Sequence, residues 1–230
     1  MFVAGVEGCR APEGWVCFKV EVPSLITSAE VIDLPSWLRN RPSNLAFLGI
    51  DIPIALPPND SRACDKEARK CLVRPRGSSV FPPPCRAVLV AQTYAEACAI
   101  NRRKMGKRLS QQAFHIREEN QAGGRCNDPR APAMGIRGPS EVCFWALNGK
   151  SAMKHNKKTE KGRNKRIDLL RPHFPNIERL LDAKPQGVGT DDLLDAAAAA
   201  WTALRRYRGE AHRVCTPERD ERGLEVTIFY

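Results

Sequence analysis

A run of six residues without a polar side chain, Leu45–Ile50, constrains the fold of this chain more than any other segment. Such a run indicates a strand that is buried on both faces, as in parallel sheets that helices cover on each side. Asp51 follows the run directly, and the chain must then leave the sheet because Pro53, Pro57 and Pro58 cannot continue a central ladder. The sequence therefore predicts an α/β protein in which Asp51 stands at the end of a central strand.

The elements before and after this run are predicted from the periodicity of apolar residues and from turn residues. Strands are expected at Phe2–Val6, Gly14–Val20 and Ala29–Leu34, the first two joined as a hairpin, with a short helix opening at Pro35 and a last strand at Val226–Tyr230. Helices are expected at Thr93–Lys104, Lys161–Leu170 and Asp191–Tyr207, and a helical or extended segment at Glu141–Leu147. Residues 121–140, which are rich in glycine and proline, are predicted to form a loop.

The predicted order of elements, β-β-β-α-β-α, is that of the ribonuclease H-like fold, so we expect a mixed central sheet flanked by helices. The 230 residues fit a single domain, 1–230, with an elaborated helical middle at 59–140. A soluble, cytoplasmic protein without a membrane partner is expected, since the sequence has neither a bilayer-spanning apolar run nor a secretory signal. Nine cysteines without a Cys-x-x-Cys pair predict reduced thiols, and the alternative of a site from Cys64, Cys71 and Cys85 lacks the usual ligand spacing.

Carboxylates follow the predicted central strands and recur at the start of the last long helix. Glu7 and Asp51 come after strands one and four, while Asp192 and Asp195 lie three residues apart on one helix face. Clustered carboxylates raise one another's pKa, so a chain gathers them in a cleft when a cation offsets the repulsion. Mg²⁺ or Mn²⁺ fits these hard oxygen ligands, and a pair of such ions can activate water against a phosphodiester.

Each carboxylate also has an ordinary structural alternative. Asp191 is placed to cap the last long helix, and Asp192 and Asp195 would favour the positive end of its dipole without any metal. Glu7 could be a turn residue before Gly8, and Asp51 could cap the turn that follows it. Metal binding is therefore a hypothesis that depends on these segments converging.

Several short motifs, taken in order, resemble one large bacterial and archaeal family. They are Gly5–Arg10, Gly49–Pro53, Arg76–Phe81, Pro84–Arg86, Ser140–Gly149, Lys157–Thr159 with Gly162–Arg163, and Asp191–Ala196. The chain is identified by this resemblance as a member of the predicted ribonuclease H-like nucleases labelled domain of unknown function 429. The resemblance covers nearly the whole chain.

The resemblance implies a ribonuclease H-like fold and the metal layout of resolvases of the RuvC type. It assigns Glu7, Asp51, Asp192 and Asp195 as catalytic metal ligands, with Glu141 as a further catalytic candidate. Two positions depart from the family pattern, which usually has aspartate at Glu7 and often a Glu-x-His-Pro-Glu stretch where this chain reads Arg137-Gly138-Pro139-Ser140-Glu141.

Basic residues are predicted to seat a nucleic-acid backbone. A net charge of +11 favours polyanionic partners, and lysines and arginines are dense between residues 154 and 166. Arginine and serine side chains near the predicted cleft suit bidentate capture of phosphate. The candidate phosphate-binding residues are Arg10, Arg76, Ser78, Ser79, Arg86, Lys157, Lys158, Lys161 and Arg163.

The sequence favours a metal-dependent nuclease acting on DNA or RNA, with water as the nucleophile. The alternative is a non-catalytic nucleic-acid-binding protein with a degenerate acidic site, which the departures at Glu7 and Arg137 motivate. A nucleotide-binding kinase or ATPase of the same fold is disfavoured, because 230 residues leave no room for two such domains. The tryptophans lie in apolar surroundings and are predicted to be core residues rather than base-stacking platforms: Trp15, Trp37, Trp145 and Trp201.

Overall fold

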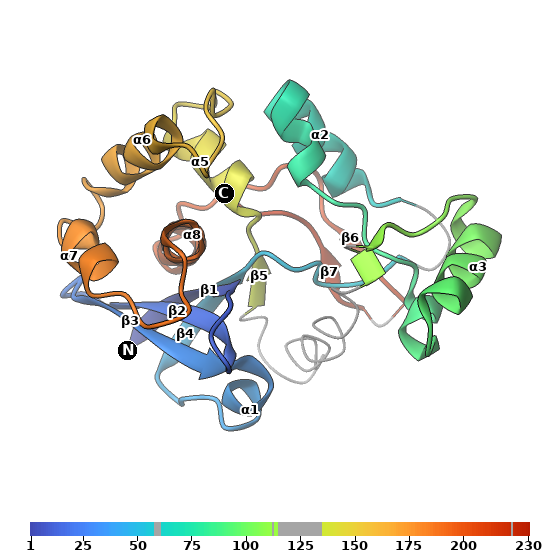
Figure 1. The fold of residues 1–230 in the computed structure, drawn as a ribbon, viewed down its shortest axis with the longest axis horizontal. Helices are drawn as coiled ribbons and strands as arrows, with labels where there is room; N and C mark the ends of the chain where they lie inside the picture. Colours follow the sequence, from blue (N-terminus) through green and yellow to red (C-terminus); the bar gives the residue numbers. More distant parts are fainter. Residues whose placement is uncertain (58–60, 112, 115–134, 222) are drawn as a thin grey trace.

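The computed structural model describes residues 1–57, 61–111, 113–114, 135–221 and 223–230. Its centre is a five-stranded mixed sheet in the order β3-β2-β1-β4-β5 (Figure 1). The hairpin β1–β2 and the pair β2–β3 are antiparallel, whereas β4 runs parallel to both β1 and β5. The strands are β1 Phe2–Gly8, β2 Gly14–Glu21, β3 Thr27–Asp33, β4 Leu45–Ile50 and β5 Gly135–Arg137.

Helix α8, Thr190–Tyr207, packs against β1 and β4 more closely than side chains would usually allow. Gly5 of β1 and Gly49 of β4 are register partners, and a Cβ atom on either would lie about 2 Å from the α8 backbone: 2.1 Å from the Ala196 oxygen for Gly5 and 2.2 Å from the Ala199 oxygen for Gly49. On the helix side, the contact is formed by a run of buried alanines at 196–200. Small residues on both surfaces therefore fix the helix directly over the two central strands.

Three more helices complete the layer on the α8 side of the sheet (Figure 1). Together with α8 they bury the largest hydrophobic cluster, which includes Phe18 of the sheet, Phe144 and Phe174. The opposite face of the sheet is covered by a second cluster around Val6, Leu34 and Ile50. The helices are α5 Ser140–Leu147, α6 Glu160–Leu170 and α7 Ile177–Asp182 on the α8 side, and α1 Leu34–Arg39 on the other.

The middle of the chain forms helices beside the sheet, at the right of Figure 1. Two further hydrophobic clusters hold this part together, and one of them also takes in the C-terminal residues Val226 and Ile228. The helices of this part are α2 Ala63–Arg76, η1 Gly77–Ser79, η2 Arg86–Val90 and α3 Tyr94–Met105. The C-terminal segment contributes a separate two-stranded sheet, β6 Glu218–Arg219 and β7 Glu225–Val226. The predicted elaboration between strand four and the later helices is thus observed as helical where it is described.

Several predicted boundaries need correction. The loop expected at residues 121–140 contains strand β5 and the start of α5, because Gly135–Arg137 pairs in parallel with β4; its residues 121–134 lie outside the described part. The last strand is shorter than predicted, since only Glu225–Val226 and an isolated bridge at Phe229 pair. Among the described residues no helix is both long and apolar enough to traverse a bilayer, and the eight described cysteines are free.

Candidate functional site

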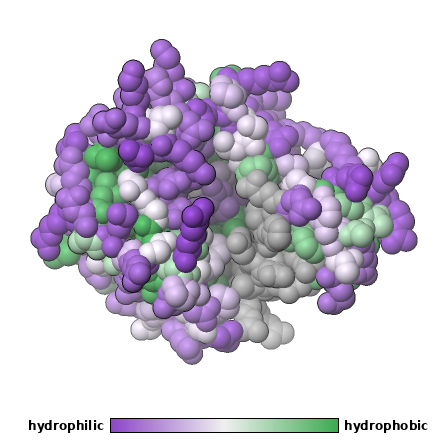
Figure 2. Space-filling view, in the orientation of Figure 1, coloured by the Kyte–Doolittle hydropathy of each residue, from purple (hydrophilic) through white to green (hydrophobic). Residues whose placement is uncertain are grey.

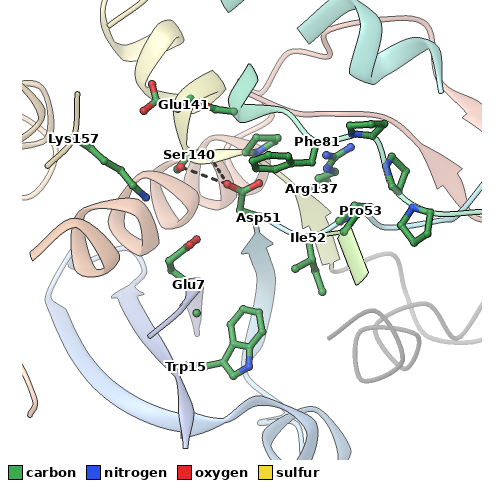
Figure 3. Close-up of a pocket in the computed structure, with 17 residues that line it drawn as sticks. Glu7, Trp15, Asp51, Ile52, Pro53, Phe81, Arg137, Ser140, Glu141 and Lys157 are labelled. Carbon is green, nitrogen blue, oxygen red and sulfur yellow. Dashed lines mark hydrogen bonds between the residues drawn. The ribbon is translucent and has the colours of Figure 1, made fainter. Parts of the chain in front are cut away.

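A cavity of about 650 Å³ opens where β1 and β4 end (Figure 3). Glu7, Asp51, Glu141 and Lys157 line one part of it, so strand ends and later helices contribute charged groups to one space. The face seen in Figure 2 is largely hydrophilic and is hollowed near its centre. The cavity therefore brings together three predicted acidic positions from widely separated segments: Glu7, Asp51 and Glu141.

The strands aim Glu7 and Asp51 at helix α8. Side chains alternate along a strand, and Gly5 and Gly49 face α8, so the residues two positions later face the same helix. Those residues are Glu7 and Asp51. They directly follow Val6 and Ile50, the last register pair between β1 and β4. The close packing of α8 on the two glycines is thus what brings a helix within reach of both carboxylates.

Helix α8 contributes the other two predicted ligands. Asp195 lies one turn before Ala199 on the face that packs on the sheet, and only 1% of its surface is exposed. Asp192 is half-buried, and its Oδ2 accepts a hydrogen bond from the Gly189 backbone N–H at 3.0 Å. The alternative in which Asp191 caps this helix is not observed: Gly189 is the N-cap, and Asp192 supplies the acceptor.

The carboxylates lie close enough to perturb one another's protonation. Burial raises the pKa of Glu7 well above its ordinary value, and the negative charges of Asp195 and Asp51 raise it further. Burial raises the pKa of Asp51 to about 7, although the Ser140 backbone N–H, 3.1 Å from its Oδ2, opposes the shift. The pKa of Asp195 is raised to about 6, again mainly by burial. A cation at this site would relieve both effects.

Lys157 supplies a positive charge from within the chain. Its Nζ lies 2.5 Å from Asp195 Oδ2, and Figure 3 shows the side chain reaching from above toward Glu7 and Asp51. Burial alone would lower the pKa of this lysine, but the charge of Asp195 and its hydrogen bond outweigh burial and raise it. Lys157 was predicted to bind phosphate; in this structure its ammonium group pairs with Asp195 of the acidic cluster.

The donor chemistry of the cluster suits Mg²⁺ or Mn²⁺, since the four predicted ligands all offer carboxylate oxygens. As these side chains are placed, however, no three acidic, histidine or cysteine residues in the described ranges surround a common point. The cation beside Asp195 is Lys157. Holding a divalent ion here would therefore require the Lys157 ammonium to withdraw from Asp195.

Glu141 is tied to a buried arginine rather than to the other carboxylates. Its Oε1 accepts from Nη2 of Arg166 at 2.5 Å, and the Arg166 guanidinium lies over the Phe144 ring. The second oxygen of Glu141, Oε2, is buried without a hydrogen-bond partner among the described residues. That oxygen is an unsatisfied acceptor at the edge of the cavity.

The predicted phosphate-binding residues do not form a single surface. Arg76 donates to the Met153 carbonyl, Ser78 donates to the Pro75 carbonyl, and Arg86 pairs with Asp220. Of the remaining candidates, Ser79 lines the cavity, Arg163 is half-buried, and three are exposed: Arg10, Lys158 and Lys161.

Among the cavity residues that were not predicted as site residues, Trp15, Phe81 and Arg137 carry the largest side chains. Trp15 and Phe81 are half-buried on the cavity wall. Trp145 and Trp201 are buried as expected, whereas Trp15 and Trp37 are only partly buried and pack against the edge of a core cluster. Arg137 is 3% exposed, lines the cavity and pairs with Asp65 of α2. The sequence could have indicated Trp15 as a site residue through its place in the predicted hairpin. Trp15 lies directly opposite Gly8, next to Glu7, which was already predicted to stand at the end of its strand.

Comparison with known proteins gives one match. No curated protein and no solved structure matches the chain. The model of one protein family matches residues 5–222, and that family is described as "Protein of unknown function (DUF429)". The match takes in both central strands, the middle helices and α8, so every carboxylate of the cavity lies inside it. The chain therefore belongs to the DUF429 family.

Proposed function

We propose that this protein is a metal-dependent nuclease with a ribonuclease H-like fold, which hydrolyses phosphodiester bonds of DNA or RNA. The observation that carries the proposal is the convergence of Glu7 and Asp51, from two central strands, on one cavity, with Asp195 of α8 close enough for its charge to raise the pKa of Glu7. A cluster in which burial and mutual repulsion raise every carboxylate pKa gains free energy from a bound cation. The mixed sheet, with a hairpin followed by a parallel strand, supports the same fold assignment.

In this proposal the carboxylates, Ser140 and Lys157 have different roles. Glu7, Asp51, Asp192 and Asp195 would hold two Mg²⁺ or Mn²⁺ ions, which supply an activated water and stabilise the leaving oxygen. The Ser140 backbone N–H and hydroxyl hold Asp51 in place, at 3.1 and 3.4 Å. Lys157 keeps the site compact until a divalent ion replaces its charge.

Substrate would reach the cavity along exposed basic side chains. Lys158 and Lys161 lie on the same loop and helix start as Lys157, and both are exposed. Arg10 is exposed at the end of β1, on the side of Asp192. Such contacts attract a phosphate backbone without reading its sequence.

The test is cleavage of a panel of labelled single-stranded, duplex, hybrid and branched nucleic acids with Mg²⁺ or Mn²⁺. Wild type is compared with Asp51→Asn, Asp195→Asn and a control, Asp182→Asn, whose carboxylate is exposed at the end of α7. We expect metal-dependent cleavage by wild type and control, and its loss in the two cavity variants. Equal cleavage by all four proteins would contradict the proposal.

A second function is favoured by a specific observation. Lys157 already pairs with Asp195, so part of the negative charge of the acidic cluster is offset without metal. A non-catalytic nucleic-acid-binding protein would have such a site. Salt-sensitive binding of nucleic acid by pure wild-type protein, with no cleavage in either metal, would establish this second function and exclude the first.

A further inference from the structure

Part of the cavity wall beside the carboxylates is aromatic and apolar. Phe81 and Trp15 lie on either side of Asp51 in Figure 3, and Ile52 and Pro53 lie between them. Prolines 82–84 extend this wall beyond Phe81. A site that bound only inorganic ions and a phosphate group would have no use for such a wall, whereas a nucleobase would stack on it.

Packing against the described residues does not explain the position of Phe81. The side chain is half-buried, yet it belongs to none of the four hydrophobic clusters formed by the described residues. Trp15 packs on the cluster around Leu34 but also faces the cavity. Within the described ranges neither ring pairs with another aromatic ring. Among the described residues, no aromatic ring therefore competes with a flat ligand for the cavity-facing side of Phe81 or Trp15.

The same wall offers an unused hydrogen-bond donor. Nη1 of Arg137 is bound to Asp65, but Nε of Arg137 is buried with no partner among the described residues. A buried guanidinium N–H left without an acceptor costs free energy that a bound acceptor would recover. Base edges and phosphate oxygens both provide such acceptors, so this donor points to a ligand beside the aromatic rings.

We propose that the cavity takes an unpaired nucleotide, with its base against Phe81 and Trp15 and an acceptor atom toward Arg137, so that the substrate class is single-stranded nucleic acid. The proposal rests on the proposed function, whose carboxylates would face the phosphate. A paired base is excluded from this position, because its faces are covered by its neighbours in the duplex. The cavity volume of about 650 Å³ falls within the range of sites that enclose small ligands.

The experiment measures binding, so that it is independent of cleavage. Fluorescence anisotropy of a short labelled oligonucleotide, single-stranded or in a blunt duplex of the same sequence, is recorded at raised salt to suppress backbone attraction. Wild type is measured with EDTA, and Asp51→Asn is measured with Mg²⁺ so that the strand stays intact. In each condition the protein is compared with versions carrying Phe81→Ala, Phe81→Trp, Trp15→Phe or Tyr207→Ala.

We expect single strands to bind at least about 10-fold more tightly than duplex, and Phe81→Ala to weaken single-strand binding by about 10-fold. Phe81→Trp and Trp15→Phe keep a stacking surface and should keep most of the affinity. Tyr207→Ala, which removes an exposed ring at the far end of α8, should change nothing. Circular dichroism shows that each variant is folded.

Equal binding of single strand and duplex in both conditions, or single-strand binding unchanged by Phe81→Ala, would overturn the proposal. Failure of the proposed function looks different. A Phe81-dependent preference for single strands without any cleavage leaves this inference standing and removes the nuclease. Cleavage that depends on Asp51, but is the same for single strands and duplex and is unchanged by Phe81→Ala, supports the nuclease and removes this inference.

Discussion

Replacing Lys157 by methionine should destabilise the protein in the absence of divalent metal. Burial raises the pKa of Asp195 from 3.8 to about 6. Each pKa unit corresponds to about 1.4 kcal/mol, so keeping this carboxylate ionised at neutral pH costs the folded state about 3 kcal/mol. The Nζ atom of Lys157 lies 2.5 Å from Asp195 and favours the ionised carboxylate. Without this lysine the buried carboxyl group takes up a proton, and the free-energy cost of Asp195 to the folded state then cannot exceed the cost of protonating it at neutral pH, about 4 kcal/mol. The variant should therefore lose about 1 to 2 kcal/mol of unfolding free energy.

Urea denaturation of wild type, Lys157→Met and Lys158→Met, with EDTA or with Mn²⁺, measures this loss. Lys158 is the matched control, because it is the next residue and its side chain is exposed. Mn²⁺ should stabilise Lys157→Met more than wild type, since no ammonium group then competes for Asp195. The reasoning is refuted if both variants unfold alike in EDTA, or if Mn²⁺ stabilises neither wild type nor Lys157→Met.

Three further outcomes follow from the packing and the charges. Because the pKa of Asp51 is raised from 3.8 to about 7, the folded state binds more protons than the unfolded state between those values. The unfolding free energy should thus fall as pH rises through that window, and Asp51→Asn should flatten the dependence in denaturation at a series of pH values. Gly49→Ala would put a Cβ 2.2 Å from the Ala199 oxygen and should cost about 3 kcal/mol or more by urea denaturation, whereas Gly8→Ala, with nothing within 4 Å, should cost far less. Arg166→Met leaves Glu141 buried and unpaired and should cost about 3 to 5 kcal/mol, most of it recovered when Glu141→Leu is added.

The strands and the long helix could be predicted because their signals are local. The apolar run Leu45–Ile50 is strand β4 with the bounds predicted, and the alanine-rich helix expected at Asp191–Tyr207 begins one residue earlier, at Thr190. The positions of Glu7 and Asp51 at the strand ends followed from the same pattern. The coarse α/β architecture with a mixed sheet is confirmed.

The rest depends on contacts between distant segments. Strand β5 is three residues long and exists because β4 offers it a free edge, so no periodicity within Gly135–Arg137 could reveal it. The pairing of Lys157 with Asp195 joins residues 38 positions apart. Arg166 belongs to the dense basic segment 154–166 that favoured a nucleic-acid partner, but it is fully buried against Glu141. Charge density along a sequence does not distinguish a binding surface from internal ion pairs.

Anomalous diffraction from crystals grown with Mn²⁺ tests most directly whether the acidic cluster is a metal site. We predict an anomalous peak beside Asp51 and Asp195 in the wild type, with the Lys157 ammonium withdrawn from Asp195, and no peak there in Asp195→Asn. Crystals of the wild type that show no peak at the cluster, with Lys157 still paired with Asp195, would contradict the proposed metal-dependent nuclease.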